Sequence, residues 1–193
     1  MLEEHNHYID QAGVGQLRQA ILAAAEAERS PVMILILPSH TAKEDLPALI
    51  AAIRTEAEKV SVPVALQLDH AVNLEQVMTG IQLGCSTIMI DGSSKPLEDN
   101  ISFTRQMVEV AHAAGISVEA ELGHVGGGDE SGTNASVESV LTRVEDAARF
   151  VAETGVDALA IAIGTSHGAY KFTRPPTGDI LAIERIKEIY ARM

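Results

Sequence analysis

Four apolar runs of strand length each lead to a carboxylate or an imidazole, and this repeated arrangement constrains the fold more than any other feature of the sequence. The runs at residues 64–68, 86–90, 117–120 and 158–163 lead to Asp69-His70, Asp91, Glu121 and His167, respectively. Since such residue types make up about a sixth of the chain, four endings of this kind would arise by accident with odds on the order of one in a hundred. We therefore interpret them as parts of one site.

The first of these endings combines two kinds of chemistry. Asp69 is a proton-transfer group, and His70 beside it is the commonest type of metal ligand. In a regular strand, neighbouring side chains would point to opposite faces. Because the backbone is expected to leave the strand here, both side chains are predicted to reach the same region at the end of the strand.

The apolar runs alternate with segments of helical period. Strands are predicted at residues 32–37, 64–68, 88–90, 116–121 and 156–163, and helices at residues 14–25, 43–60, 74–83, 99–114, 140–154 and 180–192. Continuous apolar strands that alternate with helices predict an α/β fold with a parallel sheet covered by helices. In a (β/α) barrel the functional residues lie at the C-terminal ends of the strands, which is where the four endings occur. A TIM-type (β/α)8 barrel therefore accounts for both the alternation and the site.

Charge and composition narrow the function classes. The 193 residues are 46% apolar, and 14 basic against 27 acidic residues give a formal net charge of −13. This charge repels nucleic-acid phosphates and anionic lipids, so we expect neither a nucleic-acid nor a membrane partner. The lone Cys85 offers no disulfide framework, which indicates a reducing compartment, and because it falls in a predicted buried segment we expect it to be a small core thiol. With no spanning apolar run and no signal-peptide pattern, a cytoplasmic location is expected.

A glycine-rich stretch at residues 123–132 interrupts the alternation. It is longer than an ordinary connection between a strand and a helix, and long loops beside a site often act as lids. Such a lid would carry Asp129 and Glu130 to the site on closure. An inert insertion remains the alternative interpretation of this stretch.

Several motifs resemble those of the class II, metal-dependent ketose-bisphosphate aldolases. They are LDH at residues 68–70, MIDGS at 89–93, EAELG at 119–123 and AIGTSHGAYKF at 162–172. The resemblance covers roughly residues 30–193, and the segment 170–178 is most similar to the fructose-bisphosphate branch, with the tagatose-bisphosphate branch as the close rival. It implies zinc-dependent, reversible cleavage of fructose 1,6-bisphosphate to dihydroxyacetone phosphate and glyceraldehyde 3-phosphate.

The resemblance also implies a role for each candidate residue. Asp69 would transfer the proton, and His70 and His167 would hold the catalytic zinc. Asp91 and Glu121 would lie at a second metal position, which takes a divalent or monovalent cation, and the backbone of Gly168 would bind the phosphate of a phosphorylated ketose substrate. A homo-oligomer, most simply a dimer, is implied for the complete protein.

The sequence departs from the family pattern in its extent. About five βα units are present, and segments resembling the first and last strands of the barrel, including a third zinc histidine, are missing. We therefore expect residues 1–193 to form a single but partial barrel domain with apolar edge strands at residues 32–37 and 156–163. Three function classes stay open: an aldolase, a noncatalytic subunit or remnant of one, and another metal-dependent barrel enzyme such as an isomerase.

Overall fold

The computed structural model describes residues 11–38, 46–123, 141–164 and 181–193. Its strands are β1 (Val32–Ile36), β2 (Val64–Ala71), β3 (Thr87–Ile90), β4 (Ser117–Leu122) and β5 (Ala158–Ile161). Its helices are α1 (Gln11–Ala27), α2 (Leu46–Ala57), α3 (Leu74–Leu83), α4 (Leu97–Ala113), α6 (Val144–Thr154) and α7 (Ile183–Tyr190). Every strand predicted from the sequence is therefore present.

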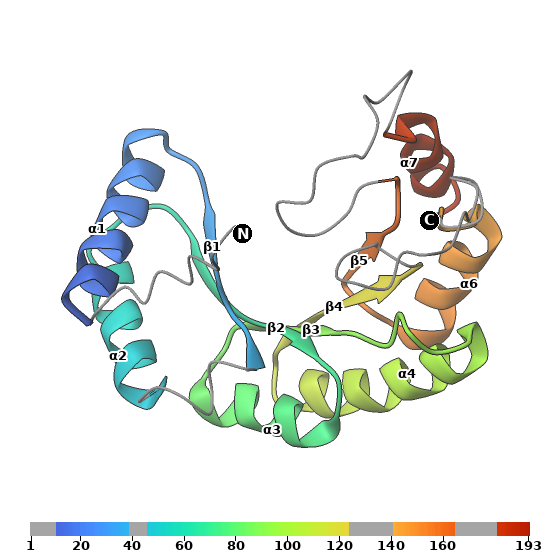
Figure 1. Ribbon diagram of the computed structural model, residues 1–193, viewed down its shortest axis with the longest axis horizontal. Coiled ribbons are helices and arrows are strands. Elements are labelled where there is room, and N and C mark those ends of the chain that lie inside the picture. The colour runs from blue at the N-terminus through green and yellow to red at the C-terminus, as the bar shows by residue number, and fades with distance from the viewer. Residues whose placement is uncertain (1–10, 39–45, 124–140, 165–180) are drawn as a thin grey trace, which may run out of the picture.

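The five strands form one parallel sheet in the order β1-β2-β3-β4-β5. The sheet curls so that the helices lie along its convex side, as part of a barrel wall (Figure 1). This arrangement confirms the predicted incomplete (β/α) barrel. Within the described residues β1 and β5 are the edges of the sheet, as the sequence predicts.

The hydrophobic core lies between the convex face of the sheet and the helices. Leu68 and Ile88 are fully buried, and both approach Gly80 of α3 so closely that a Cβ there would lie 3.0–3.1 Å from their side chains. Phe150 of α6 is also fully buried. Each such side chain contributes about 1.5–3 kcal/mol of favourable transfer free energy. Cys85 belongs to this core, and burial raises the pKa of its thiol, which agrees with the predicted structural role.

The ends of α3 follow from local sequence chemistry. The side chain of Asn73 accepts a hydrogen bond from the backbone N–H of Gln76 at the first turn. Gly84 ends the helix in the left-handed conformation with a φ of 76°, which a residue without Cβ adopts at little cost. The expected boundaries of 74–83 are therefore correct.

The start of α6 differs from the prediction by four residues. The helix begins at Val144 rather than at 140. Thr142 is buried there, where its hydroxyl donates to the carbonyl of Leu122 and accepts from the N–H of Ala162. The segment before the helix is thus held to the ends of β4 and β5, and the apolar periodicity of the sequence could not reveal these polar links.

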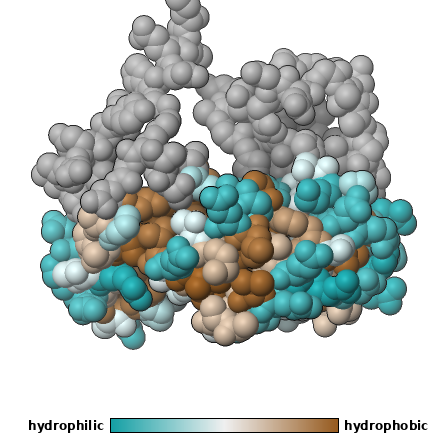
Figure 2. Space-filling model, turned by 90° about the horizontal axis from the view of Figure 1, so that it is seen from below, coloured by the Kyte–Doolittle hydropathy of each residue, from teal (hydrophilic) through white to brown (hydrophobic). Residues whose placement is uncertain are grey.

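The helical side of the molecule mixes apolar and polar surface. Viewed from below, the side on which α3 and α4 lie in Figure 1, apolar patches are visible between polar ones (Figure 2). Leu74 and Met78 of α3 are among the exposed large apolar side chains. Among the described helices none is both long enough and apolar enough to cross a membrane.

Candidate metal centre

An irregularity in β2 brings Asp69 and His70 toward the same region. Leu68 pairs with Ile88 and Ala71 pairs with Ile90, so two residues of β2 lie opposite one residue of β3. Such a bulge bends the strand and redirects a side chain. His70 takes up the irregularity with a φ of 55°, an uncommon conformation for a residue other than glycine. The expectation that β2 ends before Asp69 is therefore wrong, and the bulge within the strand takes its place.

Three side chains from neighbouring strand ends converge at this bulge. The Nδ1 atom of His70 lies 2.8 Å from Oδ2 of Asp91, at the end of β3, and 3.8 Å from Oε2 of Glu121, in β4. One potential ligand atom from each residue lies within 4.8 Å of the others. We call His70, Asp91 and Glu121 the His70 cluster. Among the described residues it is the one group of His, Cys, Asp and Glu that could hold a metal ion.

Electrostatic effects within the His70 cluster shift the pKa values of His70 and Asp91, which form its shortest contact. Partial burial alone would lower the pKa of His70, but the hydrogen bond with Asp91 and the charges of Asp69, Asp91 and Glu121 outweigh it and raise this pKa. Partial burial would raise the pKa of Asp91, but hydrogen bonds from Ser93 and His70 outweigh it and lower this pKa. The carboxylate is therefore held ionised, as metal binding requires.

Neighbouring groups hold the carboxylate of Asp91 and the backbone of Glu121 in place. Oδ1 of Asp91 accepts hydrogen bonds from the backbone N–H and the hydroxyl of Ser93, at 3.0 and 2.7 Å. Behind Glu121, the buried amide of Asn100 in α4 donates to the Glu121 carbonyl at 3.0 Å and accepts from the hydroxyl of Thr104. These contacts tie the ends of β3 and β4 to local structure. They were not predicted, because single polar residues in amphipathic helices give no signal of their partners.

The donor set of the His70 cluster fits a divalent cation. Imidazole nitrogen and carboxylate oxygen bind zinc at about 2.0–2.2 Å, so ligand atoms around a tetrahedral ion are about 3.3 Å apart. In the His70 cluster the shortest separation between ligand atoms is 2.8 Å, from Nδ1 of His70 to Oδ2 of Asp91, and none exceeds 4.8 Å. These separations lie on either side of the value expected for zinc. Small side-chain movements would bring the three ligand atoms to coordination distance.

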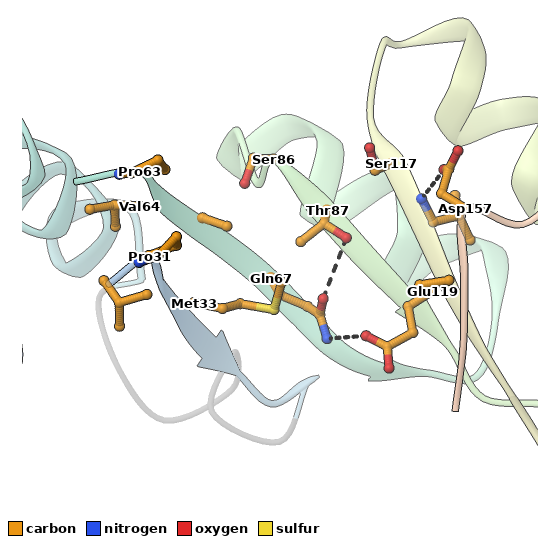
Figure 3. Close-up of a pocket in the computed structure, with 14 residues that line it drawn as sticks. Pro31, Met33, Pro63, Val64, Gln67, Ser86, Thr87, Ser117, Glu119 and Asp157 are labelled. Carbon is orange, nitrogen blue, oxygen red and sulfur yellow. Dashed lines mark hydrogen bonds between the residues drawn. The ribbon is translucent and has the colours of Figure 1, made fainter. Parts of the chain in front are cut away.

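A second group of polar residues lines the concave face below Asp69. The amide nitrogen of Gln67 lies 3.4 Å from Oδ1 of Asp69 and 3.2 Å from Oε2 of Glu119. The hydroxyl of Thr87 lies 3.4 Å from the side-chain amide oxygen of Gln67, Oε1. Figure 3 shows Gln67, Thr87 and Glu119 together at the wall of a hollow of about 580 Å³. The sequence did contain a signal for them, since Gln67 and Glu119 lie two residues before Asp69 and Glu121 and therefore share their strand face.

Other sequence-predicted site residues lie outside the described part of the chain. These are His167 and Gly168, together with Asp129 and Glu130 of the predicted lid. Of the predicted site residues, the structure thus brings together Asp69, His70, Asp91 and Glu121.

Comparison with known proteins identifies the family to which the chain is similar. The family model for class II fructose-bisphosphate aldolases matches residues 14–193. A fructose-bisphosphate aldolase of Stutzerimonas stutzeri is 42% identical over a match of 210 positions. The match covers 98% of this chain and 59% of that relative. One of Giardia intestinalis is 44% identical, over 89% of this chain and 52% of that relative. The chain thus spans between one half and two thirds of the length of these relatives.

The fold agrees with the same family. The crystal structure of the YdjI aldolase from Escherichia coli K12 superimposes with a TM-score of 0.74 at 29% sequence identity. The superposition covers 92% of this chain and 59% of that one. The chain is therefore similar to class II aldolases in its sequence and in the arrangement of its strands.

Proposed function

Because this chain belongs to the class II fructose-bisphosphate aldolase family, we propose that it supplies the metal-binding and proton-transfer side chains for the reversible cleavage of fructose 1,6-bisphosphate. The products are dihydroxyacetone phosphate and glyceraldehyde 3-phosphate. The observation that carries this proposal is the position of Asp69 beside the His70 cluster, at the ends of three adjacent strands. An acid–base group next to a cation site is what a metal-assisted aldol cleavage needs.

His70, Asp91 and Glu121 are the ligands that we assign to divalent cations, with zinc at His70. His167, by its resemblance to the family motif, is assigned as a further zinc ligand. When bound, zinc supplies Lewis acidity that polarises the ketose carbonyl. The acidic neighbours of His70 hold its ring in position, and Ser93 holds Asp91. Gly168 is assigned to the substrate phosphate through its backbone N–H.

Asp69 is assigned to proton transfer at the C4 oxygen of the substrate. In cleavage its carboxylate takes the proton of the C4 hydroxyl as the C3–C4 bond breaks and the C4 oxygen becomes that of an aldehyde. In condensation the same proton returns to that oxygen. The described hydrogen-bond donor to the Asp69 side chain is the amide of Gln67, whose nitrogen lies 3.4 Å from Oδ1.

We further propose that residues 1–193 belong to one barrel domain of a cytoplasmic enzyme. The single parallel sheet supports one domain, because all five strands share it. The formal charge of −13 supports a small-molecule substrate over nucleic acid.

The test completes residues 1–193 with the parts of the Stutzerimonas stutzeri aldolase that lie outside the matched region, which covers 59% of that relative. We expect zinc-dependent cleavage of fructose 1,6-bisphosphate that a chelator abolishes and added zinc restores. Asp69→Asn should lower kcat by about 10³-fold and leave zinc content unchanged, because a general acid–base group contributes about 10²–10⁴-fold.

Parallel assays with tagatose 1,6-bisphosphate decide the epimer. A ratio of kcat/KM that favours tagatose bisphosphate would replace the proposed substrate. A folded, zinc-loaded chimera that cleaves neither compound would overturn the proposed function, and so would an Asp69→Asn variant that keeps most of its kcat.

A further inference from the structure

We propose that Gln67 is a positioning residue for Asp69, holding the proton-transfer carboxylate in place through an amide shared with Glu119. This inference rests on the proposed function, in which Asp69 is the proton-transfer group. It concerns the polar side chains of Gln67, Thr87 and Glu119, which lie together at the wall of the hollow (Figure 3).

Gln67 is almost completely buried, with 3% of its surface exposed. A buried amide requires hydrogen-bond partners, since leaving one of its polar atoms unsatisfied costs about 1–3 kcal/mol. The partners of Gln67 lie on three strands: Asp69 on β2, Thr87 on β3 and Glu119 on β4. The side chain thus links β2 to β4 across β3.

These partners determine which way the amide points. Ionised carboxylates can only accept hydrogen bonds, whereas the hydroxyl of Thr87 can donate. The amide nitrogen must therefore face Asp69 and Glu119, and the carbonyl oxygen must face Thr87, as the contacts at 3.4, 3.2 and 3.4 Å require. The opposite orientation would direct the carbonyl oxygen at two negative charges.

The shared amide constrains the position of Asp69. Its nitrogen lies within hydrogen-bonding distance of the carboxylates of both Asp69 and Glu119, so one donor holds the two acidic side chains, which would otherwise repel each other, on the concave face.

Strand geometry explains why position 67 can do this. Gln67 and Asp69 are two residues apart and share the concave face, and Gln67 pairs in register with Thr87. The side chain of Gln67 is long enough to reach Glu119, which a serine or asparagine at this position would not reach. Gln67 contacts none of the three residues of the His70 cluster in these bonds, so its effect on Asp69 can be separated from metal binding.

The test compares Gln67→Met, which keeps the length of the side chain and removes the amide, with Gln82→Met, the same change on the exposed face of α3. In the zinc-loaded chimera we expect Gln67→Met to lower kcat at least 10-fold, with KM and zinc affinity within twofold of the parent. Gln82→Met should change none of these quantities. Thr87→Val, which removes the group that orients the amide, should lower kcat in the same direction and provides a second variant if Gln67→Met does not fold.

A double-mutant cycle distinguishes positioning from a general structural effect. If Gln67 acts through Asp69, Gln67→Met should lower kcat less than twofold further in the Asp69→Asn background. Full multiplication of the two losses, or a Gln67→Met variant with kcat within twofold of the parent, would overturn the proposal.

Crystal structures of residues 1–193 with and without Gln67→Met give a readout that does not need turnover. We expect the Asp69 carboxylate in the variant to move away from the position that it has in the parent structure. If the chimera cleaves no ketose bisphosphate, the proposed function fails and these structures alone judge the role of Gln67. An unchanged Asp69 carboxylate in the variant would then overturn that role.

Discussion

The Nδ1 atom of His70 lies 2.8 Å from Oδ2 of Asp91, although 21 residues separate them in the sequence. The other oxygen of Asp91 is held by Ser93, so this carboxylate is fixed from two sides. The contact depends on the bulge in β2, which gives His70 its positive φ. A local irregularity of one strand thus assembles the His70 cluster.

Replacing His70 should abolish tight metal binding. In His70→Ala the His70 cluster loses its only nitrogen donor, and we expect the zinc dissociation constant to rise about 100-fold or more. His112→Ala is the matched control, because His112 is an exposed histidine on α4 that pairs with Asp157 outside the cluster. Zinc titration followed by calorimetry measures both variants. Equal affinity in His70→Ala and the parent would show that the ligands lie elsewhere.

The acidic surroundings of His70 predict how its ring titrates. The pKa of His70 in the metal-free protein should lie above its ordinary value of 6.5, since the neighbouring carboxylates outweigh partial burial. As protons compete with the metal for this ring, zinc affinity should fall when the pH drops through that raised pKa.

Heteronuclear NMR of the metal-free protein measures the ring directly. Asp91→Asn should lower the pKa of His70, because it removes both the strongest hydrogen-bond acceptor and a negative charge. A His70 pKa at or below 6.5 in the parent protein would contradict the electrostatic argument.

How far the sequence could predict this structure depends on which kind of signal each part carries. Strands such as β3 and β4 were predictable because continuous apolar runs mark buried parallel strands, and the endings at Asp91 and Glu121 marked the edge on which a site forms. The bulge at His70 was not predictable, because strand periodicity assumes one residue opposite one residue. For Gln67 the spacing indicates only that it shares a strand face with Asp69; its partners Thr87 and Glu119 could not be predicted, because they depend on β3 and β4 lying beside β2.

Gly92 should tolerate no side chain. A Cβ at this position would lie 2.1 Å from Oδ1 of Asn100, which is itself held by Thr104 in the buried interior. We expect Gly92→Ala to lower the free energy of unfolding by about 1–3 kcal/mol or more through overpacking.

Gly115→Ala is the control for the loss of a glycine, because a Cβ there meets nothing within 4 Å and only its φ of 74° is strained. That strain costs about 1–2 kcal/mol. Urea denaturation of both variants gives the comparison. A Gly92→Ala protein as stable as the parent would show that Asn100 can move away, and that the support behind Glu121 is not rigid.

The edge strand β1 predicts self-association of residues 1–193. Within the described sheet, β1 has a paired neighbour on one side only. Two of its large apolar side chains, Leu35 and Met33, are 53% and 48% exposed. Unprotected apolar edges pair with other chains, and a charged side chain on the edge is a common natural protection. We therefore expect purified residues 1–193 to elute as species larger than a monomer in size-exclusion chromatography with light scattering, and Leu35→Lys to shift them toward the monomer.

Leu74→Lys places the same charge on α3, where Leu74 is 47% exposed but lies on no strand edge. If association depends on the edge of β1, this control should leave the size distribution of the parent unchanged. If it depends on exposed apolar surface in general, both lysine variants should reduce it equally, and the argument from the edge would fail. A monodisperse monomer for the parent protein at about 100 μM, within the μM–mM range in which exposed edges associate, would contradict the prediction directly.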